Sequence, residues 1–149
     1  MDQTRGSMDY VHLMQKALKM MVKETLKCVE EHGLFGLSYF YITFKPTFQG
    51  AFIPKYLLEK YPDKMTIVLQ HEFWDLHVYD TYFSVSLLFN NTLENLKIPF
   101  NSIYRFEDPN EPLALDFFVA ASEEETITPE SDDNIISLDT FRKNKEPQN

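Results

Sequence analysis

The stretch Tyr82–Phe89, with the sequence YFSVSLLF, decides which class of fold the chain adopts. Its apolar side chains recur at every second position, where they are Phe83, Val85, Leu87 and Phe89. Successive side chains of a β-strand point to opposite faces of a sheet, so this alternation predicts a strand with one face in a core. The Asn90-Asn91 pair that follows is typical of a tight connection to another strand.

Four more stretches are rich in aromatic or β-branched residues and predict short strands. They are residues 38–44 (SYFYITF), 65–71 (MTIVLQH), 95–100 (NLKIPF) and 113–119 (LALDFFV). Between them, Pro54 and Pro62 bracket a short helix, and Asn101 is expected to begin a turn of helix through residues 102–106. Strands joined without regular intervening helices predict a mostly antiparallel sheet that curls into a small barrel or sandwich.

A single long helix is predicted ahead of these strands, from Asp9 to His32. Asp9 is placed to cap its first turn, and Gly33 to end it in the left-handed conformation. The apolar residues of this helix step by three and four positions and form two rows. The first row consists of Val11, Met14, Leu18, Met21, Thr25 and Cys28. The second row consists of Tyr10, Leu13, Ala17 and Met20.

We expect the first row to cover the strands and the second to form a dimer interface with another copy of the chain. A surface helix of a monomer usually needs only one apolar row. Four lysines mark the side that faces solvent, and they are Lys16, Lys19, Lys23 and Lys27. The alternative is one wide row buried on the sheet, without self-association. In either case the predicted class is α+β, with a long N-terminal helix packed on a small antiparallel β-barrel or sandwich.

Composition excludes several classes of function. The 149 residues are enough for one domain, and a net charge of −9 opposes binding to phosphate backbones, so nucleic acid is not an expected partner. Cys28 is the only cysteine, which excludes an intrachain disulfide. The first ten residues lack the apolar segment of a secretory signal, and no run approaches about 18 apolar residues. These features predict a cytoplasmic protein that does not enter a membrane.

Potential metal ligands are dense in one place, at His71, Glu72, Asp75 and His77. The two histidines are one residue too far apart for the helical spacing of zinc proteases. On a strand, His71, Asp75 and His77 would share a face, but the aromatic residues among them favour packing. The chain also lacks a nucleophile elbow and a phosphate-binding loop. We therefore expect no metal, no cofactor and no enzymatic activity.

The two ends of the chain differ from the body at 8–119. Residues 1–7 are expected to be disordered or the remnant of an expression tag. Residues 120–134 are acidic, contain Pro129 and predict a flexible linker with an average reach of about 20 Å. Its carboxylates are those of Glu123, Glu124, Glu125, Glu130, Asp132 and Asp133.

Residues 135–149 carry an apolar cluster after this linker. Its members are Ile135, Ile136, Leu138 and Phe141, and the polar residues among and beside them are Ser137, Asp139, Arg142 and Lys143. Apolar side chains at the end of a flexible segment need another surface to bury against, which predicts a docking peptide for a partner protein. The alternative is that this segment folds back as an edge strand on its own barrel.

Several stretches together resemble one protein family. In chain order they are MDYVHLMQKAL, FYITF, MTIVLQHEFWDL, FSVSLLFNN and PFNSIYRFEDP, followed by IISLDTFRKN near the end. They are similar to the alphaproteobacterial branch of the stringent starvation protein B family. The resemblance is nearly continuous from Met8 to Phe118 and resumes in the tail.

This resemblance implies a homodimeric adaptor with an Sm-like barrel, which holds ssrA-tagged polypeptides and tethers them to the ClpXP protease. The tail would then dock on the N-terminal domain of the ClpX unfoldase. The family's tag-binding groove corresponds to Leu87, Phe89, Asn90 and Asn91, with Gln70 and His71 opposite. A distant branch has a Gly-Gly pair where this chain has Asn90-Asn91.

Two other interpretations stay open at this point. Leu87 and Phe89 are also suited to a simple barrel core. An Sm-like barrel with exposed aromatic residues would bind single-stranded RNA, although the net charge opposes this.

Overall fold

The computed structural model describes residues 8–34, 36 and 38–120. These residues belong to two compact units, residues 8–18 and residues 19–120. The expectations for residues 1–7, for the acidic linker after residue 120 and for the tail at 135–149 lie outside the described residues. In the described part of the chain, no helix is both long enough and apolar enough to cross a membrane.

The long N-terminal helix, α1, extends from Tyr10 to His32. At its start, Asp9 Oδ1 accepts a hydrogen bond of 3.0 Å from the backbone N–H of His12. At its end, Gly33 adopts a φ of 79° and donates its N–H to the carbonyl of Val29 at 2.8 Å. The acidic cap and the glycine stop predicted from the sequence are confirmed.

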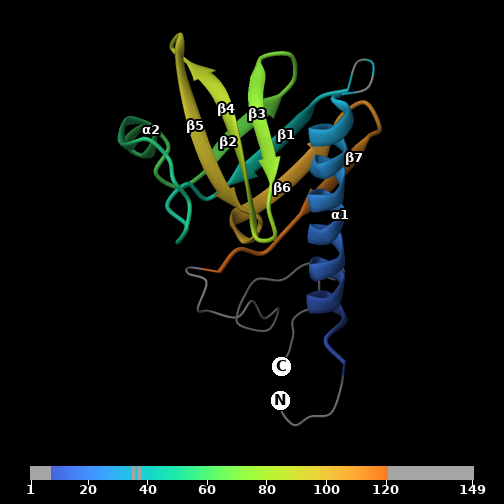
Figure 1. Ribbon diagram of the computed structural model, residues 1–149. Coiled ribbons are helices and arrows are strands. Elements are labelled where there is room, and N and C mark those ends of the chain that lie inside the picture. Colours follow the sequence, from blue (N-terminus) through green and yellow to red (C-terminus); the bar gives the residue numbers. More distant parts are fainter. Residues whose placement is uncertain (1–7, 35, 37, 121–149) are drawn as a thin grey trace. The chain divides into compact units, whose positions relative to one another are not determined.

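The strands form two antiparallel sheets (Figure 1). The first has the order β2-β1-β6-β7, with β1 at Phe40–Phe44, β2 at Met65–Leu69, β6 at Ile103–Asp108 and β7 at Leu113–Asp116. The second has the order β3-β4-β5, with β3 at Phe73–Val78, β4 at Tyr82–Phe89 and β5 at Thr92–Pro99. A short helix, α2, covers Lys55–Lys60, and a 3-10 turn, η1, covers Phe100–Ser102. The predicted α+β class is confirmed, and all five predicted strand stretches contain strands.

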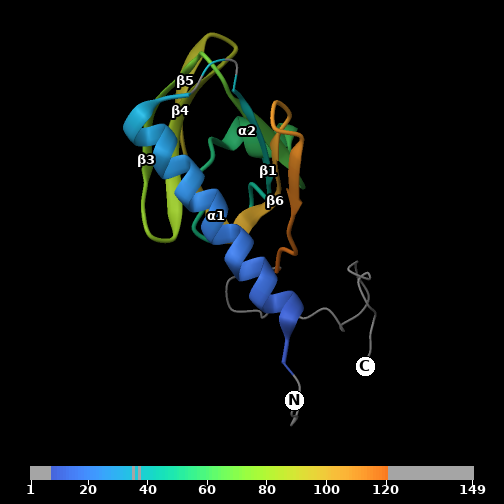
Figure 2. The same ribbon diagram turned by 90° about the vertical axis from the view of Figure 1, so that its right-hand side faces the viewer.

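The apolar core lies between the two sheets, which Figure 2 shows on either side of the interior. Strands β1 and β2 bury every second residue, as their alternating sequences predict. The rings of Phe40 and Phe106 stack with their centroids 5.2 Å apart. The side chains that these strands bury are Phe40, Ile42, Phe44, Met65, Ile67 and Leu69, and those of β4 and β5 are Phe83, Val85, Leu87, Leu96 and Ile98.

The packed side of α1 is not the one expected. Val22, Leu26 and Val29 are buried, whereas Met21 is 40% exposed and Cys28 is exposed. The expectation that the row from Val11 to Cys28 covers the strands is therefore wrong.

Two lysines that contact the body explain why the sequence pattern indicates the wrong side of α1 as the packed one. Lys19 Nζ donates to Asn101 Oδ1 at 3.1 Å, and Lys23 Nζ lies 2.9 Å from Asp80 Oδ1. Both belong to the side of α1 that packs on the body, so they do not mark the solvated side. Burial lowers the pKa of Lys19, and the hydrogen bond from Lys23 lowers the pKa of Asp80. Their long apolar stems cover the core while the amines reach polar partners at its edge.

Two segments differ from the expected secondary structure. The helical turn expected at residues 102–106 is limited to η1, and Ile103 begins strand β6. Strand β3 is not among the predicted strands, although Trp74, Leu76 and Val78 alternate with Asp75 and His77 in the sequence. The register shows an irregularity there: Trp74 pairs with Ser86 and His77 with Ser84, so β3 has an extra residue. Asp75 has a φ of 54°, which fits a β-bulge.

Replacing Leu26 by alanine is expected to destabilise the protein by about 2–5 kcal/mol. Leu26 has no exposed surface, so the substitution removes buried methyl groups and leaves a cavity. Urea unfolding followed by circular dichroism measures the change. Glu24→Ala, at an exposed position of the same helix, is the matched control and should stay within about 0.5 kcal/mol of the parent. Equal effects of the two substitutions would contradict the assignment of the packed face.

Candidate functional site

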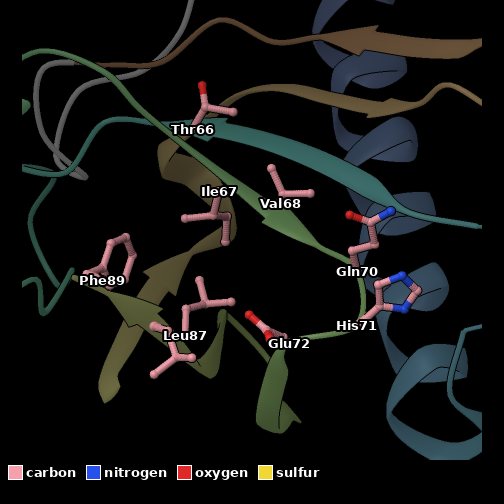
Figure 3. A pocket seen from close by; sticks show the side chains of 9 residues that line it. Thr66, Ile67, Val68, Gln70, His71, Glu72, Leu87 and Phe89 are labelled. Carbon is pink, nitrogen blue, oxygen red and sulfur yellow. The ribbon is translucent and has the colours of Figure 1, made fainter. Parts of the chain in front are cut away.

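An open groove of about 420 Å³ lies between β2 and the end of β4 (Figure 3). Figure 3 shows Gln70 and His71 at one end of the groove and Phe89 at the other, with Ile67 and Leu87 between them. The residues that line it are Thr66, Ile67, Val68, Gln70, His71, Glu72, Leu87, Leu88 and Phe89. The groove is therefore formed by one strand from each sheet and by the connection between β2 and β3.

Each side of the groove is an unpaired strand edge. Strand β2 is the terminal strand of its sheet, so within the described residues its outer edge has no neighbour. Strand β3 begins at Phe73, which pairs with Leu87, and the last residues of β4, Leu88 and Phe89, extend beyond it. Unpaired edges present backbone N–H and C=O groups that an added strand can satisfy. The groove is thus suited to an extended chain.

The side chains of the groove form an apolar middle with exposed flanks. Ile67 and Leu87 are 2% and 6% exposed and belong to the core side of their sheets. Val68 and Leu88, the next residue on each strand, point the other way and are 39% and 41% exposed. An extended chain between the strands would therefore meet apolar side chains on both of its faces.

A polar end closes the groove at the connection from β2 to β3. Gln70, His71 and Glu72 occupy this connection, and all three are exposed. They offer hydrogen-bond donors and acceptors, whereas Phe89 makes the opposite end apolar. The two ends therefore present different chemistry to a bound chain.

The turn after β4 fixes the position of the apolar end. Phe89 pairs with Thr92, so β4 and β5 are joined by a two-residue turn at Asn90 and Asn91. These residues have φ angles of 52° and 66°, the left-handed values that a tight hairpin of this length requires. Asparagine tolerates this conformation better than most residues other than glycine, which explains how this chain forms the turn without glycine.

A hydrogen bond attaches helix α2 to strand β5, which pairs with β4 on the side opposite β3. Tyr56 Oη donates a 2.7 Å hydrogen bond to Glu94 Oε2, and Glu94 is the pairing partner of Leu87. This hydrogen bond raises the pKa of Tyr56, and burial and the negative charge of Glu94 act in the same direction. The contact attaches α2 to β5 close to the groove.

The sequence of this chain matches the model of a known protein family over most of its length. Residues 12–149 match the model described as stringent starvation protein B. The chain belongs to this family. No curated protein matches the chain. Stringent starvation protein B is an adaptor family not known for enzymatic activity, and membership supports a general role as an adaptor for ClpXP, with other proteins as its partners.

The structure brings together four of the six residues that the family resemblance assigned to tag binding. Gln70, His71, Leu87 and Phe89 all line the groove. Asn90 and Asn91 form the adjacent turn and do not line it. Sequence reasoning missed five lining residues, which are Thr66, Ile67, Val68, Glu72 and Leu88. The alternation in MTIVL indicates which of them point inward, but it does not indicate that β2 is a terminal strand.

The group of potential metal ligands is dispersed. His71 lies in the connection before β3, and the bulge at Asp75 places His77 on the same face as Trp74. The arrangement in which His71, Asp75 and His77 share a face of one strand therefore does not occur. Within the described ranges, no three His, Cys, Asp or Glu side chains gather where they could hold a metal ion.

The row assigned to a dimer interface is exposed along α1. Tyr10, Leu13 and Met20 are 69%, 45% and 52% exposed, and Ala17 is exposed as well. These residues step by three and four positions and so share a face of the helix. An apolar row of this kind is unusual on the surface of a monomer.

Replacing Asn91 by alanine is expected to destabilise the protein by about 1 kcal/mol, because a Cβ without a compensating side-chain hydrogen bond is strained at positive φ. Asn91→Gly retains the turn and should leave the stability nearly unchanged. The free energy of unfolding in urea distinguishes the two variants. A loss that is no greater for alanine than for glycine would contradict the left-handed turn.

Proposed function

We propose that this chain captures ssrA-tagged polypeptides in the groove between β2 and β4 and tethers them to the ClpXP protease. The observation that carries the proposal is the pair of unpaired strand edges on either side of the groove, in a chain of the stringent starvation protein B family. An unfolded tag is extended and has free backbone groups along its length. The groove offers complementary groups along both of its sides.

The tag is held as an additional strand between the two sheets. Its backbone pairs with the outer edge of β2, with the end of β4, or with both, and this pairing requires little of the tag's sequence. Specificity then comes from side chains that enter the apolar middle at Ile67 and Leu87 and from polar contacts at Gln70 and His71. Asn90 and Asn91 contribute by holding the β4–β5 turn in place, and their amides extend the polar contacts beyond Phe89.

Delivery depends on the tail. The docking peptide at 135–149 binds the N-terminal domain of ClpX through Ile135, Ile136, Leu138 and Phe141. The acidic linker at 120–134 joins it to the body at 8–119, so a captured substrate stays close to the unfoldase. A short flexible linker of this kind gives an effective concentration on the order of millimolar. The polar residues of the peptide, Ser137, Asp139, Arg142 and Lys143, set its orientation.

The adaptor acts as a homodimer through α1. The exposed row of Tyr10, Leu13, Ala17 and Met20 supports this proposal, since packing two such rows together would remove the apolar surface from water. A dimer carries two tails and two grooves. Simultaneous docking of both tails then strengthens the apparent affinity for a multimeric unfoldase.

Capture and delivery should be separable by mutation. The double variant Leu138→Ala, Phe141→Ala is expected to bind a fluorescein-labelled ssrA peptide with the affinity of the parent but to lose stimulated degradation at low substrate concentration. The physical reason is that the substitutions remove the apolar anchors of the docking peptide and leave the groove intact. Fluorescence anisotropy measures capture, and loss of a fluorescent ssrA-tagged substrate in the presence of ClpXP measures delivery.

Arg142→Ala is the control, because a charge at the rim of an interface mostly changes the rate of encounter and the dependence on salt. It should reduce delivery less than the double variant does. Undiminished proteolysis with the double variant would overturn the role of the tail. Absence of ssrA peptide binding by the parent protein would overturn the function of the groove.

The dimer should dissociate when a charge is placed in the exposed row of α1. Leu13→Glu is expected to yield a monomer, because a carboxylate without a partner is costly at the centre of an interface. Sedimentation equilibrium measures the change in mass. His12→Gln, at an exposed position on a different face of α1, is the control. If the mass of Leu13→Glu is the same as that of the parent, α1 does not form the interface through this row.

A further inference from the structure

Three large apolar residues lie together on the outward face of the β3-β4-β5 sheet, next to the groove. Leu88 pairs with Leu93, and Trp74 pairs with Ser86, the residue two positions before Leu88. Pairing partners in an antiparallel sheet point to the same face, and diagonal neighbours are within reach of a large side chain. Trp74, Leu88 and Leu93 are 43%, 41% and 53% exposed. We call these three residues the Trp74 patch.

The polar side chains beside the patch, those of Ser86 and Asn95, form a hydrogen bond with each other. Asn95, the partner of Ser86 on β5, donates a 2.9 Å hydrogen bond from Nδ2 to Ser86 Oγ. Ser86 is only 4% exposed, so its hydroxyl is not offered to a ligand. The surface between Trp74 and Leu93 therefore presents apolar side chains and an amide, without a formal charge.

Isolated apolar residues are common on protein surfaces, and exposure alone would not indicate a binding site. The Trp74 patch differs because it continues the groove. Leu88 belongs to both, since it lines the groove on one side and pairs with Leu93 on the other. A ligand strand along the free end of β4 would therefore lie beside Leu88, at the edge of the patch.

The geometry of an added strand shows which part of a ligand reaches the patch. A strand beside β4 would lie about 4.8 Å away, with its side chains alternately inward and outward. The inward side chains would face Ile67 and Leu87. The outward ones would be flanked by Val68 on β2 and Leu88 on β4, in the same row as Leu93.

We propose that the Trp74 patch is a second recognition surface for the captured polypeptide, which binds a large apolar side chain on the outward face of the groove-bound segment. This inference rests on the proposed capture of peptides in the groove and adds a requirement to it. The ligand must carry an apolar residue adjacent in sequence to the one that enters the groove. Tryptophan at the centre of the patch suits this role, because tryptophan is enriched among residues that dominate binding energy.

Trp74 is the only tryptophan of the chain and therefore reports directly on the patch. An unlabelled, tryptophan-free ssrA peptide should shift Trp74 emission to shorter wavelength and reduce its quenching by acrylamide. Anisotropy of a fluorescein-labelled ssrA peptide measures binding separately. Serine is substituted at each position of the peptide in turn to find the outward-facing residue.

Leu93→Gln is expected to weaken binding of the parent peptide about tenfold, the effect of no longer burying one leucine side chain. Leu93→Gln should weaken binding little further when the outward-facing residue of the peptide is already serine. Phe52→Gln is the matched control, because Phe52 is 66% exposed and its backbone pairs with Lys97 on the same strand. This control should bind both peptides as the parent protein does.

Peptide binding without any change in Trp74 emission, together with equal affinities for Leu93→Gln and Phe52→Gln, would overturn the second surface and leave the groove's function intact. Absence of peptide binding by the parent would instead overturn the function itself. In the absence of peptide, Trp74 emission that changes with protein concentration would mean that a second copy covers the patch. A change on removal of residues 121–149 would mean that the tail covers it, and both of these outcomes also contradict the proposal.

Discussion

A mismatch in length between two neighbouring strands leaves a groove at one end of the β3-β4-β5 sheet. Strand β4 extends to Phe89, whereas its partner β3 begins to pair with it only at Leu87. The backbone of the last β4 residues therefore faces a space rather than a neighbour, and the terminal strand β2 of the other sheet borders the same space. The two-residue turn at Asn90-Asn91 holds this end of β4 in position. An extension of β3 by two residues would pair with Leu88 and Phe89 and remove this free edge.

The outer edge of β3, in the β3-β4-β5 sheet, is in contact with helix α1. Helix α1 lies along the outer side of β3, where Glu30 Oε1 accepts a 3.0 Å hydrogen bond from the backbone N–H of Val78. The other carboxylate oxygen of Glu30 lies 3.6 Å from His77 Nδ1. Together with the salt bridge between Lys23 and Asp80, these contacts attach the helix to the last residues of β3 and to the turn between β3 and β4. Helix α1 thus hydrogen-bonds a backbone group at the outer edge of β3. Within the described residues, the outer edge of β2 and the end of β4 border the groove without such a partner.

Much of this architecture follows from local patterns in the sequence. The alternation in YFSVSLLF and MTIVL, the cap at Asp9 and the stop at Gly33 each depend on neighbouring residues, and each was predictable. The packed face of α1 is not predictable in this way, because lysines usually lie on solvated faces. Here Lys19 and Lys23 contact partners that are 82 and 57 residues away in the sequence. The bulge in β3 is not predictable from local pattern, because simple alternation would put Trp74 on the same face as Leu76, whereas Leu76 is buried and Trp74 is exposed. For the groove, the inward side chains were predictable, but the pairing of strands that leaves two edges free is a property of the whole topology.

The free edges of the groove also affect how the protein behaves when crowded with copies of itself. Exposed strand edges are the surfaces through which native proteins associate into non-native sheets, and the usual protections are short edges, bulges, charges and covering helices. Here the bulge at Asp75 and the side chain of Glu30 protect β3, while the unpaired end of β4 is limited to Leu88 and Phe89. That end of β4 alone is too short to recruit a whole foreign strand, whereas within the described residues the outer edge of β2 is free over Met65–Leu69. A longer free edge at this end of β4 would therefore expose more backbone to an added strand and would also favour aggregation.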